Sequence, residues 1–403
     1  MSPRGDSRPV RVAVVAEFYP SLRDPVLGIW AHRQALAARD AGAEVRVLVL
    51  RRLVPPRASL AEGPAVAARE LRSMLAEPRR QIHDGLTVEY VRYASPPRDR
   101  AYPRWAAWAA PPLAVALQRL RRSFPYELVH AHNAVPAGDA VRRAHAGAPL
   151  VVSVHGGDVL YTARRSRAGA AAVGRGLGAA RLVLANSQGI AELSAHHGAR
   201  ETRVVHLGAE LPAGQRQRVA DGERSLVTVA HLIARKRHGD VLRALAVLGD
   251  RYPRLRYRVI GDGPERTALE GLAARLEISD RVDFLGQLPP AEAIETASSS
   301  TLFVMPSTDE AFGVAYIEAM AAGVPAIGCR GEPGPEEIAA AGDGMVLVPP
   351  GDIERLTQRI DELLSDPHRL REAGQRARAT VAGHFTWERC GQQTLKAYRD
   401  LLA

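Results

Sequence analysis

Cysteine, lysine and long apolar runs are all scarce in this sequence of 403 residues. Cys329 and Cys390 are the only cysteines, too few for a disulfide framework or a cysteine-ligated metal site. No apolar run reaches the roughly 18 residues of a transmembrane helix. The first residues, MSPRGDSRPVRVAVVAEF, lack the long apolar region of a signal peptide. We therefore expect a cytoplasmic protein.

The formal net charge of +10 comes almost entirely from arginine. Lys236 and Lys396 are the only lysines, so 52 of the 54 basic residues are arginines. The arginines are spread along the chain, and no helix-turn-helix, zinc-finger or aromatic RNA-binding signature accompanies them. We therefore expect no nucleic-acid partner, which leaves an anionic membrane surface or an anionic small substrate.

One segment has the composition of a helix that lies on a membrane. RWAAWAAPPLAVALQRLRRSF, residues 104–124, mixes tryptophan, leucine and arginine as interfacial helices do. It predicts peripheral contact with the inner face of a membrane. The alternative is a core-facing helix with a solvated arginine face, which Pro111 and Pro112 favour because they interrupt the interfacial pattern.

Short runs rich in valine and leucine alternate with longer alanine-rich helical patterns. The runs expected to form strands are residues 10–16, 44–50, 86–93, 128–130, 150–154, 181–186, 203–207, 225–231, 256–261, 281–286, 302–307, 324–328 and 345–349. Strands that are apolar throughout and separated by helices indicate parallel sheets covered on both faces. The sequence therefore predicts an α/β protein with two Rossmann-like domains.

The boundary between these domains is marked by PAGQRQRVADGER, which is polar, contains glycines and has no periodicity. It predicts an N-terminal domain of residues 1–208, a linker of residues 209–224 and a C-terminal domain of residues 225–385. Ligands of such sheets bind beyond the carboxyl ends of the strands. Candidate site residues are therefore those that follow predicted strands.

The stretch VIGDGPER, residues 259–266, follows one such strand. Gly261 and Gly263 allow a tight turn and a close approach to an anion near a helix start. As a dinucleotide fingerprint the motif is incomplete, because Arg266 stands at the third glycine position. A glycine-rich turn without a ligand is the alternative, so the motif is weak evidence for a dehydrogenase.

Lys236, in AHLIARKRHGD, stands out in a chain that uses arginine almost everywhere. An ammonium is a compact point charge suited to phosphate, whereas guanidinium prefers planar bidentate partners. The alternative is a solvated charge run at a helix start. Positive charge is unfavourable there against the helix dipole, which favours an anionic ligand as the explanation.

Histidines follow two neighbouring strands of the first half. VVSVHGGDVL places His155 at a strand end, before two glycines and Asp158, and HAHNAVPAGDA holds His130 and His132. A functional His155 and a structural one are comparably supported by this context. We expect no metal, because no third ligand follows His130 and His132 at metal spacing.

PSTDEAFGVAYIEAM holds two glutamates eight positions apart, Glu310 and Glu318. A strand ends before the loop, and a helix is expected from near Gly313 to a stop at Gly323. The two carboxylates need not face each other, because the loop separates them. The free amides of Phe312, Gly313 and Val314 at the helix start would form an anion or hydroxyl site beside both.

These residues resemble the Glu-x7-Glu signature of retaining GT-B glycosyltransferases of the group 1, family 4-like type. VIGDGPERTALE, RVDFLGQLP, LVPPGDIERL, HFTWERC, HAHN and HGGD occur in the expected order, and the resemblance covers residues 10–400. It implies a GT-B fold, with a final helix over residues 386–403 that crosses back to the N-terminal domain. It also implies transfer of a hexose from a nucleotide sugar to an acceptor hydroxyl.

The resemblance assigns roles to residues of the C-terminal half. Glu310 would lie near the hydroxyls of the donor sugar, and Glu318 would hold the ribose. Lys236 would neutralise the departing diphosphate, where localised positive charge is needed as the bond breaks. The amides of the helix start would meet sugar and diphosphate, and the base would meet the backbone of Phe284, Leu285 and Gly286.

In the N-terminal half, the resemblance places His155 near the sugar C6 hydroxyl and the reaction centre. Gly28, the last residue of FYPSLRDPVLG, would belong to a loop that faces diphosphate and acceptor. One position departs from the family pattern. Relatives commonly carry arginine five residues before the lysine, where this chain has His231. Either His231 or Arg235 would then take over that role.

The implied chemistry needs neither a metal nor a cofactor. The leaving diphosphate would act as the base toward the acceptor hydroxyl, and helix amides and cations would replace magnesium. The donor would be a UDP- or GDP-sugar, and the acceptor a glycan, a lipid-linked or a small molecule in cell-envelope polysaccharide, glycolipid or secondary-metabolite assembly. The alternatives are a nucleotide-sugar epimerase of the same architecture and a non-catalytic sugar-nucleotide binder.

Overall fold

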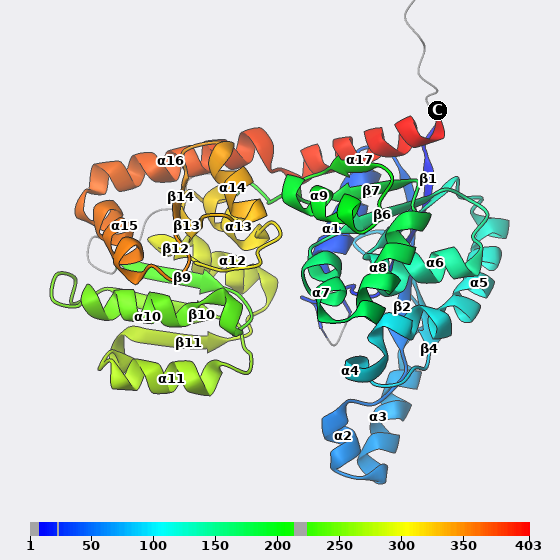
Figure 1. The fold of residues 1–403 in the computed structure, drawn as a ribbon, viewed down its shortest axis with the longest axis horizontal. Helices are drawn as coiled ribbons and strands as arrows, with labels where there is room; N and C mark the ends of the chain where they lie inside the picture. Colours follow the sequence, from blue (N-terminus) through cyan, green and yellow to red (C-terminus); the bar gives the residue numbers. More distant parts are fainter. Residues whose placement is uncertain (1–7, 22–23, 213–223) are drawn as a thin grey trace, which may run out of the picture. The chain divides into compact units, whose positions relative to one another are not determined.

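The computed structural model describes residues 8–21, 24–212 and 224–403. Most of the predicted linker, residues 213–223, therefore lies outside the described residues. The chain divides into two compact units (Figure 1). The N-terminal unit consists of Met1–Val205 and Cys390–Ala403, and the C-terminal unit of His206–Arg389.

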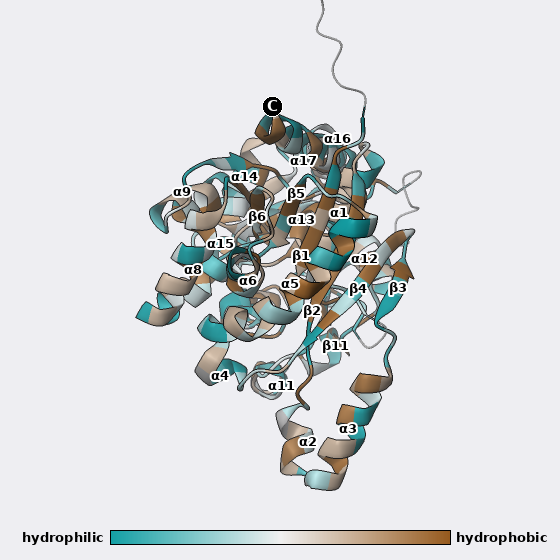
Figure 2. Ribbon diagram, turned by 90° about the vertical axis from the view of Figure 1, so that its right-hand side faces the viewer, coloured by the Kyte–Doolittle hydropathy of each residue, from teal (hydrophilic) through white to brown (hydrophobic). Residues whose placement is uncertain are grey.

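The N-terminal unit is built on an eight-stranded sheet in the order β3-β4-β2-β1-β5-β6-β7-β8. All neighbours are parallel except β3 and β4. The strands are β1 Arg11–Ala16, β2 Glu44–Arg52, β3 Arg80–His83, β4 Leu86–Tyr93, β5 Leu128–His132, β6 Leu150–Val154, β7 Leu182–Ala185 and β8 Thr202–Val204. The central strands β1 and β2 are among the most hydrophobic parts of the unit (Figure 2), because both faces of the sheet are covered.

The C-terminal unit is built on a six-stranded sheet in the order β11-β10-β9-β12-β13-β14, in which every pair is parallel. This is the doubly wound order in which strand succession reverses at the centre, between β9 and β12. The strands are β9 Ser225–Val229, β10 Arg256–Ile260, β11 Val282–Gly286, β12 Leu302–Val304, β13 Ala326–Cys329 and β14 Met345–Val348.

Helices connect the strands in both units. Those of the N-terminal unit are α1 Ile29–Asp40, α2 Arg57–Ala61, α3 Pro64–Ala76, α4 Arg98–Ala101, α5 Trp105–Ser123, α6 Asp139–Ala144, α7 Ala163–Arg165, α8 Arg167–Ala179 and α9 Gln188–His196. Those that follow β9 are α10 His238–Val247, α11 Arg266–Arg275, α12 Pro290–Ser298, α13 Val314–Ala321, α14 Pro333–Ala340, α15 Ile353–Ser365, α16 Pro367–His384 and α17 Trp387–Leu402.

The side chains of β12 show how the C-terminal sheet is covered. Leu302 and Val304 belong to a buried cluster with residues of α10, α11 and α15. Phe303, between them, points to the opposite face because successive strand residues alternate. There its ring packs edge-on against Tyr316 of α13, with centroids 5.4 Å apart. Both faces are thus buried, which explains why the strand is apolar throughout.

Two local features bear on the sequence-based expectations, one missed and one left open between two alternatives. Strand β3 has the polar sequence RQIH, which gave no strand signal, but it forms a hairpin with β4. Asp84 and Gly85 both take positive φ in the turn, and an Asp-Gly pair favours such turns. Helix α5 continues through Pro111 and Pro112 and buries one face against the unit, as the core-facing alternative predicted.

The last helix, α17, spans the boundary of the two units, and its residues from Cys390 onward belong to the N-terminal unit. The hydroxyl of Tyr398 lies 2.7 Å from Nδ1 of His130, at the end of β5. Gly391 is close to the backbone of Ala37 in α1, where an added Cβ would meet the carbonyl oxygen at 2.0 Å. A side chain at Gly391 would therefore push the helix away from α1.

Candidate functional site

The central strands of the C-terminal sheet bring the two principal charged residues together. Lys236 lies seven residues after β9 ends, and Glu310 lies six residues after β12 ends. These neighbouring strands are parallel, so their carboxyl ends meet at one edge. Because the strand order reverses between them, this edge is the position where doubly wound sheets bind ligands.

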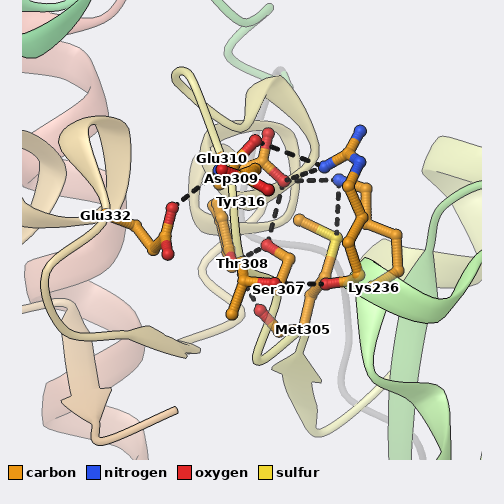
Figure 3. Close-up of polar contacts among 9 residues, drawn as sticks. Lys236, Met305, Ser307, Thr308, Asp309, Glu310, Tyr316 and Glu332 are labelled. Atoms are coloured by element: carbon orange, nitrogen blue, oxygen red, sulfur yellow. Dashed lines mark hydrogen bonds and ion pairs between the residues drawn. The ribbon is translucent and has the colours of Figure 1, made fainter. Parts of the chain in front are cut away.

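Lys236 and Glu310 form a buried ion pair at this edge (Figure 3). The ammonium Nζ donates to Oε2 of Glu310. Arg235 adds a second cation, with Nη1 3.7 Å from the same oxygen. Both cations lie on a short 3₁₀ helix, Ala234–Lys236. This helix ends at Arg237, which has the left-handed conformation with φ 56°. The structure thus brings three of the predicted residues together.

The charges of this group determine what Glu310 can do. Burial opposes ionisation of its carboxyl, but Lys236, Arg235 and the Ser307 hydroxyl outweigh burial and hold the pKa of Glu310 below its ordinary value. Burial lowers the pKa of the Lys236 ammonium, and the carboxylate of Glu310 counteracts that shift. At neutral pH Glu310 is therefore an anion and a hydrogen-bond acceptor, and it has no proton to donate.

Residues that sequence reasoning missed hold Glu310 in place. Ser307 Oγ donates to Oε2 of Glu310 at 2.9 Å and lies 3.2 Å from the hydroxyl of Tyr316. Glu332, the residue before α14, accepts a hydrogen bond from the amide of Glu310 at 2.8 Å. Ser307 had a signal, since it is the last residue of the predicted strand, residues 302–307, and lies three residues after β12. Glu332 is distant in sequence, and only the fold brings it here.

The loop after Glu310 leads into α13, as the sequence predicted. Gly313 is the residue before the helix and has φ 91°, a conformation that favours glycine. Its missing side chain leaves room for the ring of Tyr316, since an added Cβ would lie 2.3 Å from that ring. Val314 is the first residue of the helix. Glu318, half-buried, follows one turn later on the same face as Val314.

Phe312 contributes its backbone to this region, while its ring is buried in the C-terminal unit. The ring stacks on His206, with centroids 5.6 Å apart and planes inclined by 18°. It also packs against Phe385 at 5.7 Å. These contacts fix the amide of Phe312 beside Gly313.

Gly261 and Gly263 lie after β10, and their close approach is to the chain itself. A Cβ added to Gly261 would lie 2.0 Å from the carbonyl oxygen of Ala230. A Cβ added to Gly263 would lie 2.4 Å from the carbonyl oxygen of Leu232. The Gly261 amide donates to the carbonyl of Gly286, and the Gly263 amide to Asp262. The glycines thus pack this turn against the segment after β9, and both amides have protein partners.

The predicted base-binding stretch forms the end of the edge strand β11. The pairing register shifts beside it, so that Val259 pairs with Phe284 and Ile260 with Gly286. Leu285 has no partner in that register, and its side chain is 40% exposed. The carbonyl of Phe284 accepts a hydrogen bond from Arg266 at 3.3 Å.

His231 is the predicted residue that the structure leaves apart from the cation pair. It follows β9, and its side chain is exposed. Within the described part of the chain, no hydrogen bond or ion pair joins it to Lys236 or Glu310. Arg235, in contrast, reaches Glu310 and also lies 3.5 Å from the carbonyl of Asp309.

In the N-terminal unit, His155 follows β6 and pairs with a second histidine. Its Nε2 lies 3.0 Å from Nδ1 of His132, at the end of β5. The two rings are stacked, with centroids 5.3 Å apart and planes 5° from parallel. Burial lowers the pKa of His155 to about 3. The adjacent Asp158 points elsewhere and accepts from the amides of Ala134 and Val135.

Gly28 lies at the other predicted position of the N-terminal unit. It is buried, has φ 76° and immediately precedes α1. An added Cβ would lie 2.2 Å from the backbone of Phe18, two residues after β1. Glycine is therefore needed to bring the start of α1 against the end of β1.

In residues 8–21, 24–212 and 224–403, no helix is both long enough and apolar enough to cross a membrane. In the same ranges, no three His, Cys, Asp or Glu side chains are grouped as metal ligands would be.

Two protein-family models match the chain. The model described as Glycosyltransferase Family 4 matches residues 27–211, and that described as Glycosyl transferases group 1 matches residues 214–380. A D-inositol 3-phosphate glycosyltransferase of Nocardia farcinica is 28% identical over 100% of this chain and 92% of its own length. Other curated relatives, 29–34% identical, align with this chain over less than half of their own length.

Solved structures resemble the whole chain. Sucrose-phosphate synthase from Thermosynechococcus elongatus superposes with a TM-score of 0.76 at 22% identity, over 97% of this chain and 99% of that one. Anabaena HepE in complex with UDP and glucose has a TM-score of 0.70 at 19% identity, over 97% of this chain and 100% of its own. These likenesses confirm the predicted GT-B fold with two Rossmann-like domains.

Proposed function

Since this chain belongs to the group 1, family 4-like glycosyltransferases, we propose that it moves a hexose from a nucleotide-diphosphate donor to an acceptor hydroxyl with retention of configuration. The acceptor belongs to cell-envelope polysaccharide, glycolipid or secondary-metabolite assembly. The reaction takes place in the cytoplasm, at the inner face of the membrane where the acceptor is lipid-linked.

The observation that carries this proposal is the buried Lys236–Glu310 pair at the carboxyl edge of the C-terminal sheet. Breaking the glycosyl bond leaves new negative charge on the diphosphate. A localised ammonium in a buried site stabilises such charge far more than it would in water. Lys236 takes this role, and Arg235 adds the second cation in place of His231.

Glu310 binds hydroxyls of the donor sugar as an acceptor of hydrogen bonds. Its anionic state supports this assignment, because a carboxylate without a proton accepts and does not donate. Ser307 and Lys236 orient the same oxygen, Oε2, which leaves Oε1 for the sugar.

Nucleotide binding falls to the segment that includes the start of α13. The first amides of a helix have no intrahelical partner and attract anions. Phe312, Gly313 and Val314 therefore meet sugar and diphosphate, and Glu318 binds the ribose one turn later. The backbone of Phe284, Leu285 and Gly286 meets the base, while Gly261 and Gly263 shape the adjoining turn.

The transfer step needs no protein base. The bond between the anomeric carbon and the diphosphate oxygen breaks, and its electron pair stays on the diphosphate. The acceptor oxygen forms its bond to the same carbon from the same face, and its proton passes to a diphosphate oxygen. Retaining hydrolases differ, since a pair of carboxylates serves as acid and nucleophile.

The donor series to test starts with UDP-sugars, because the HepE structure named above holds UDP and glucose. A thermal-shift panel of UDP-, GDP-, ADP- and dTDP-sugars identifies the donor, since a ligand that binds only the folded state raises its stability. Acceptors are then screened with that donor, and the product is analysed by NMR. An inverted anomeric carbon would contradict the mechanism, and epimer formation without acceptor would identify the epimerase alternative.

A further inference from the structure

A half-exposed arginine in the N-terminal unit is framed by aromatic rings. Arg98 begins α4, and its side chain is 52% exposed. Its guanidinium lies 4.0 Å from the ring centroid of Tyr102, 5.2 Å from Phe18 and 5.8 Å from Trp105. Such contacts hold a guanidinium in one orientation while its outer N–H groups stay accessible.

The carboxyl nearest to Arg98 does not accept a hydrogen bond from its guanidinium. Glu17, the first residue after β1, has Oε1 3.7 Å from Arg98, too long for a hydrogen bond. Its other oxygen lies 2.9 Å from the hydroxyl of Tyr102. Burial raises the pKa of Glu17 to about 7, although Arg98 acts in the opposite direction. At neutral pH a part of this carboxyl is therefore protonated and uncharged.

Arg52, on β2, adds a second positive charge to this cluster. Its guanidinium lies 4.9 Å from the ring centroid of Trp105, and it donates to both the hydroxyl and the carbonyl of Ser95. Arg98 donates no hydrogen bond to any residue that the structure describes. Arg52 uses two of its nitrogens on Ser95, whereas Arg98 keeps all of its donors for another partner.

The cluster lies at the carboxyl edge of the N-terminal sheet. Glu17 directly follows β1. The hydroxyl of Tyr102 donates to the carbonyl oxygen of Val135 at 3.0 Å, and Val135 lies just beyond β5. The strand order reverses between β1 and β5, so this is the ligand-binding edge of the unit. Phe18 packs against Trp30 at 6.4 Å, and Trp30 against His155 at 6.0 Å.

We propose that Arg98 binds an anionic group of the acceptor, a phosphate or a carboxylate, while the reacting hydroxyl lies on the side of His155. Two aromatic rings, Phe18 and Trp30, separate the two positions, which suits a substrate with its charge remote from the hydroxyl that reacts. The identification of the ligand as the acceptor rests on the proposed glycosyltransferase function; the anion site itself does not.

Calorimetric titration of the full chain with matched probes tests the site. The phosphate arm compares inositol 1-phosphate with myo-inositol, and the carboxylate arm compares glucuronate with glucose. We expect at least one charged probe to bind ten times or more tighter than its neutral counterpart. Arg98→Gln should weaken that binding at least fivefold. Arg104→Gln, which removes an exposed arginine from the same short segment, should leave it unchanged.

Thermal unfolding is measured in each variant as a check that the protein is folded. Equal affinity of wild type for charged and neutral probes would overturn the proposal, as would unchanged binding by the Arg98→Gln protein. The probes need no donor sugar. A chain that transfers no sugar therefore contradicts the proposed function, while the affinities still decide whether Arg98 binds anions.

A pH series sharpens the test, because Glu17 should take up a proton when an anion binds beside it. The groups that face Glu17 are Arg98, Arg52, Tyr102, Tyr93 and Asp158. Glucuronate is a suitable probe because its carboxylate does not titrate between pH 6 and 8. Its affinity for the wild type should fall as pH rises through about 7. The Glu17→Gln variant should bind glucuronate equally at pH 6 and pH 8. The same pH dependence in that variant would exclude Glu17 as the source of the effect.

Discussion

Lys236 shows how one residue acquires a role from its surroundings. It is one of two lysines, and its side chain is 11% exposed, against 73% for Lys396. A buried ammonium next to a carboxylate and a guanidinium is a preorganised charge. A solvated lysine on α17 is screened by water and contributes little.

Replacing Lys236 by alanine should lower kcat about a hundredfold or more, the magnitude found when one donor to a developing charge is removed. Steady-state kinetics with the identified donor measure this. Lys396→Ala is the matched control and should retain wild-type kcat. A Lys236→Ala enzyme that lost only donor affinity would reverse the roles given to Lys236 and Glu318, since Glu318→Ala is expected to weaken nucleotide binding.

Arg235 and His231 offer a second contrast between neighbouring residues. Arg235→Ala should lower kcat/KM about tenfold or more, since it removes a cation 3.7 Å from Glu310. His231→Ala should change it less than about threefold, because the side chain is exposed. Unchanged kinetics in the double variant would show that neither position replaces the arginine of relatives.

His155 predicts a pH dependence of stability. Its folded pKa of about 3 lies below the ordinary histidine value of 6.5, so the folded state binds fewer protons. Its contribution to stability is complete above about pH 6.5 and is lost as pH falls toward 3, by about 1.4 kcal/mol per pH unit. Chemical denaturation between pH 7 and 4 measures this slope.

His155→Gln should reduce that slope by about one proton, whatever its effect on stability at pH 7. The control is His368→Gln, since the side chain of His368 on α16 is 71% exposed. Identical slopes in wild type and His155→Gln would show that His155 is not held neutral by burial.

At the scale of the element, α13 depends on the residue before it. Gly313 and Gly331 both have positive φ, 91° and 81°. A Cβ at Gly313 would lie 2.3 Å from the Tyr316 ring, whereas nothing lies within 4 Å at Gly331. Substitution of Gly331 therefore introduces backbone strain alone, whereas substitution of Gly313 introduces strain and a steric clash.

Gly313→Ala should destabilise the protein by more than the roughly 1 kcal/mol that strain alone causes, and should weaken donor binding because the helix start moves. Gly331→Ala should lose only the roughly 1 kcal/mol of stability that backbone strain costs, and should bind the donor normally. Thermal unfolding and nucleotide titration give the two readouts. Equal effects of both substitutions would contradict the role of the Tyr316 contact.

At the scale of the whole molecule, the proposed mechanism handles phosphate charge with protein groups. Exhaustive dialysis against EDTA should leave transfer activity within about twofold of the untreated enzyme, because Lys236, Arg235 and helix amides carry that charge. Coupled assays of nucleotide release measure it. Activity that is lost on EDTA treatment and restored by magnesium would contradict metal independence, whereas loss without recovery would indicate damage to the protein.

The strand pattern was predictable because a parallel strand buried on both faces must be apolar throughout. Each predicted run contains or overlaps a strand, with ends shifted by a few residues, as for β5 and β12. β3 was missed because its residues are exposed or half-buried and its formation depends on pairing with β4, which its own polar sequence does not indicate. The order of strands in the sheets also lay beyond the sequence pattern, since it depends on tertiary contacts.

The sequence by itself determined the α/β class, the candidate residues after the strands and the glycine that starts α13, because these follow from local periodicity and backbone geometry. Only the tertiary structure decided which of them meet. It joined Lys236 to Glu310, placed Arg235 rather than His231 near this pair, and placed Glu332 beside the amide of Glu310. It also brought Arg98 and Glu17 together, and their charge and burial depend on neighbours that are distant along the chain.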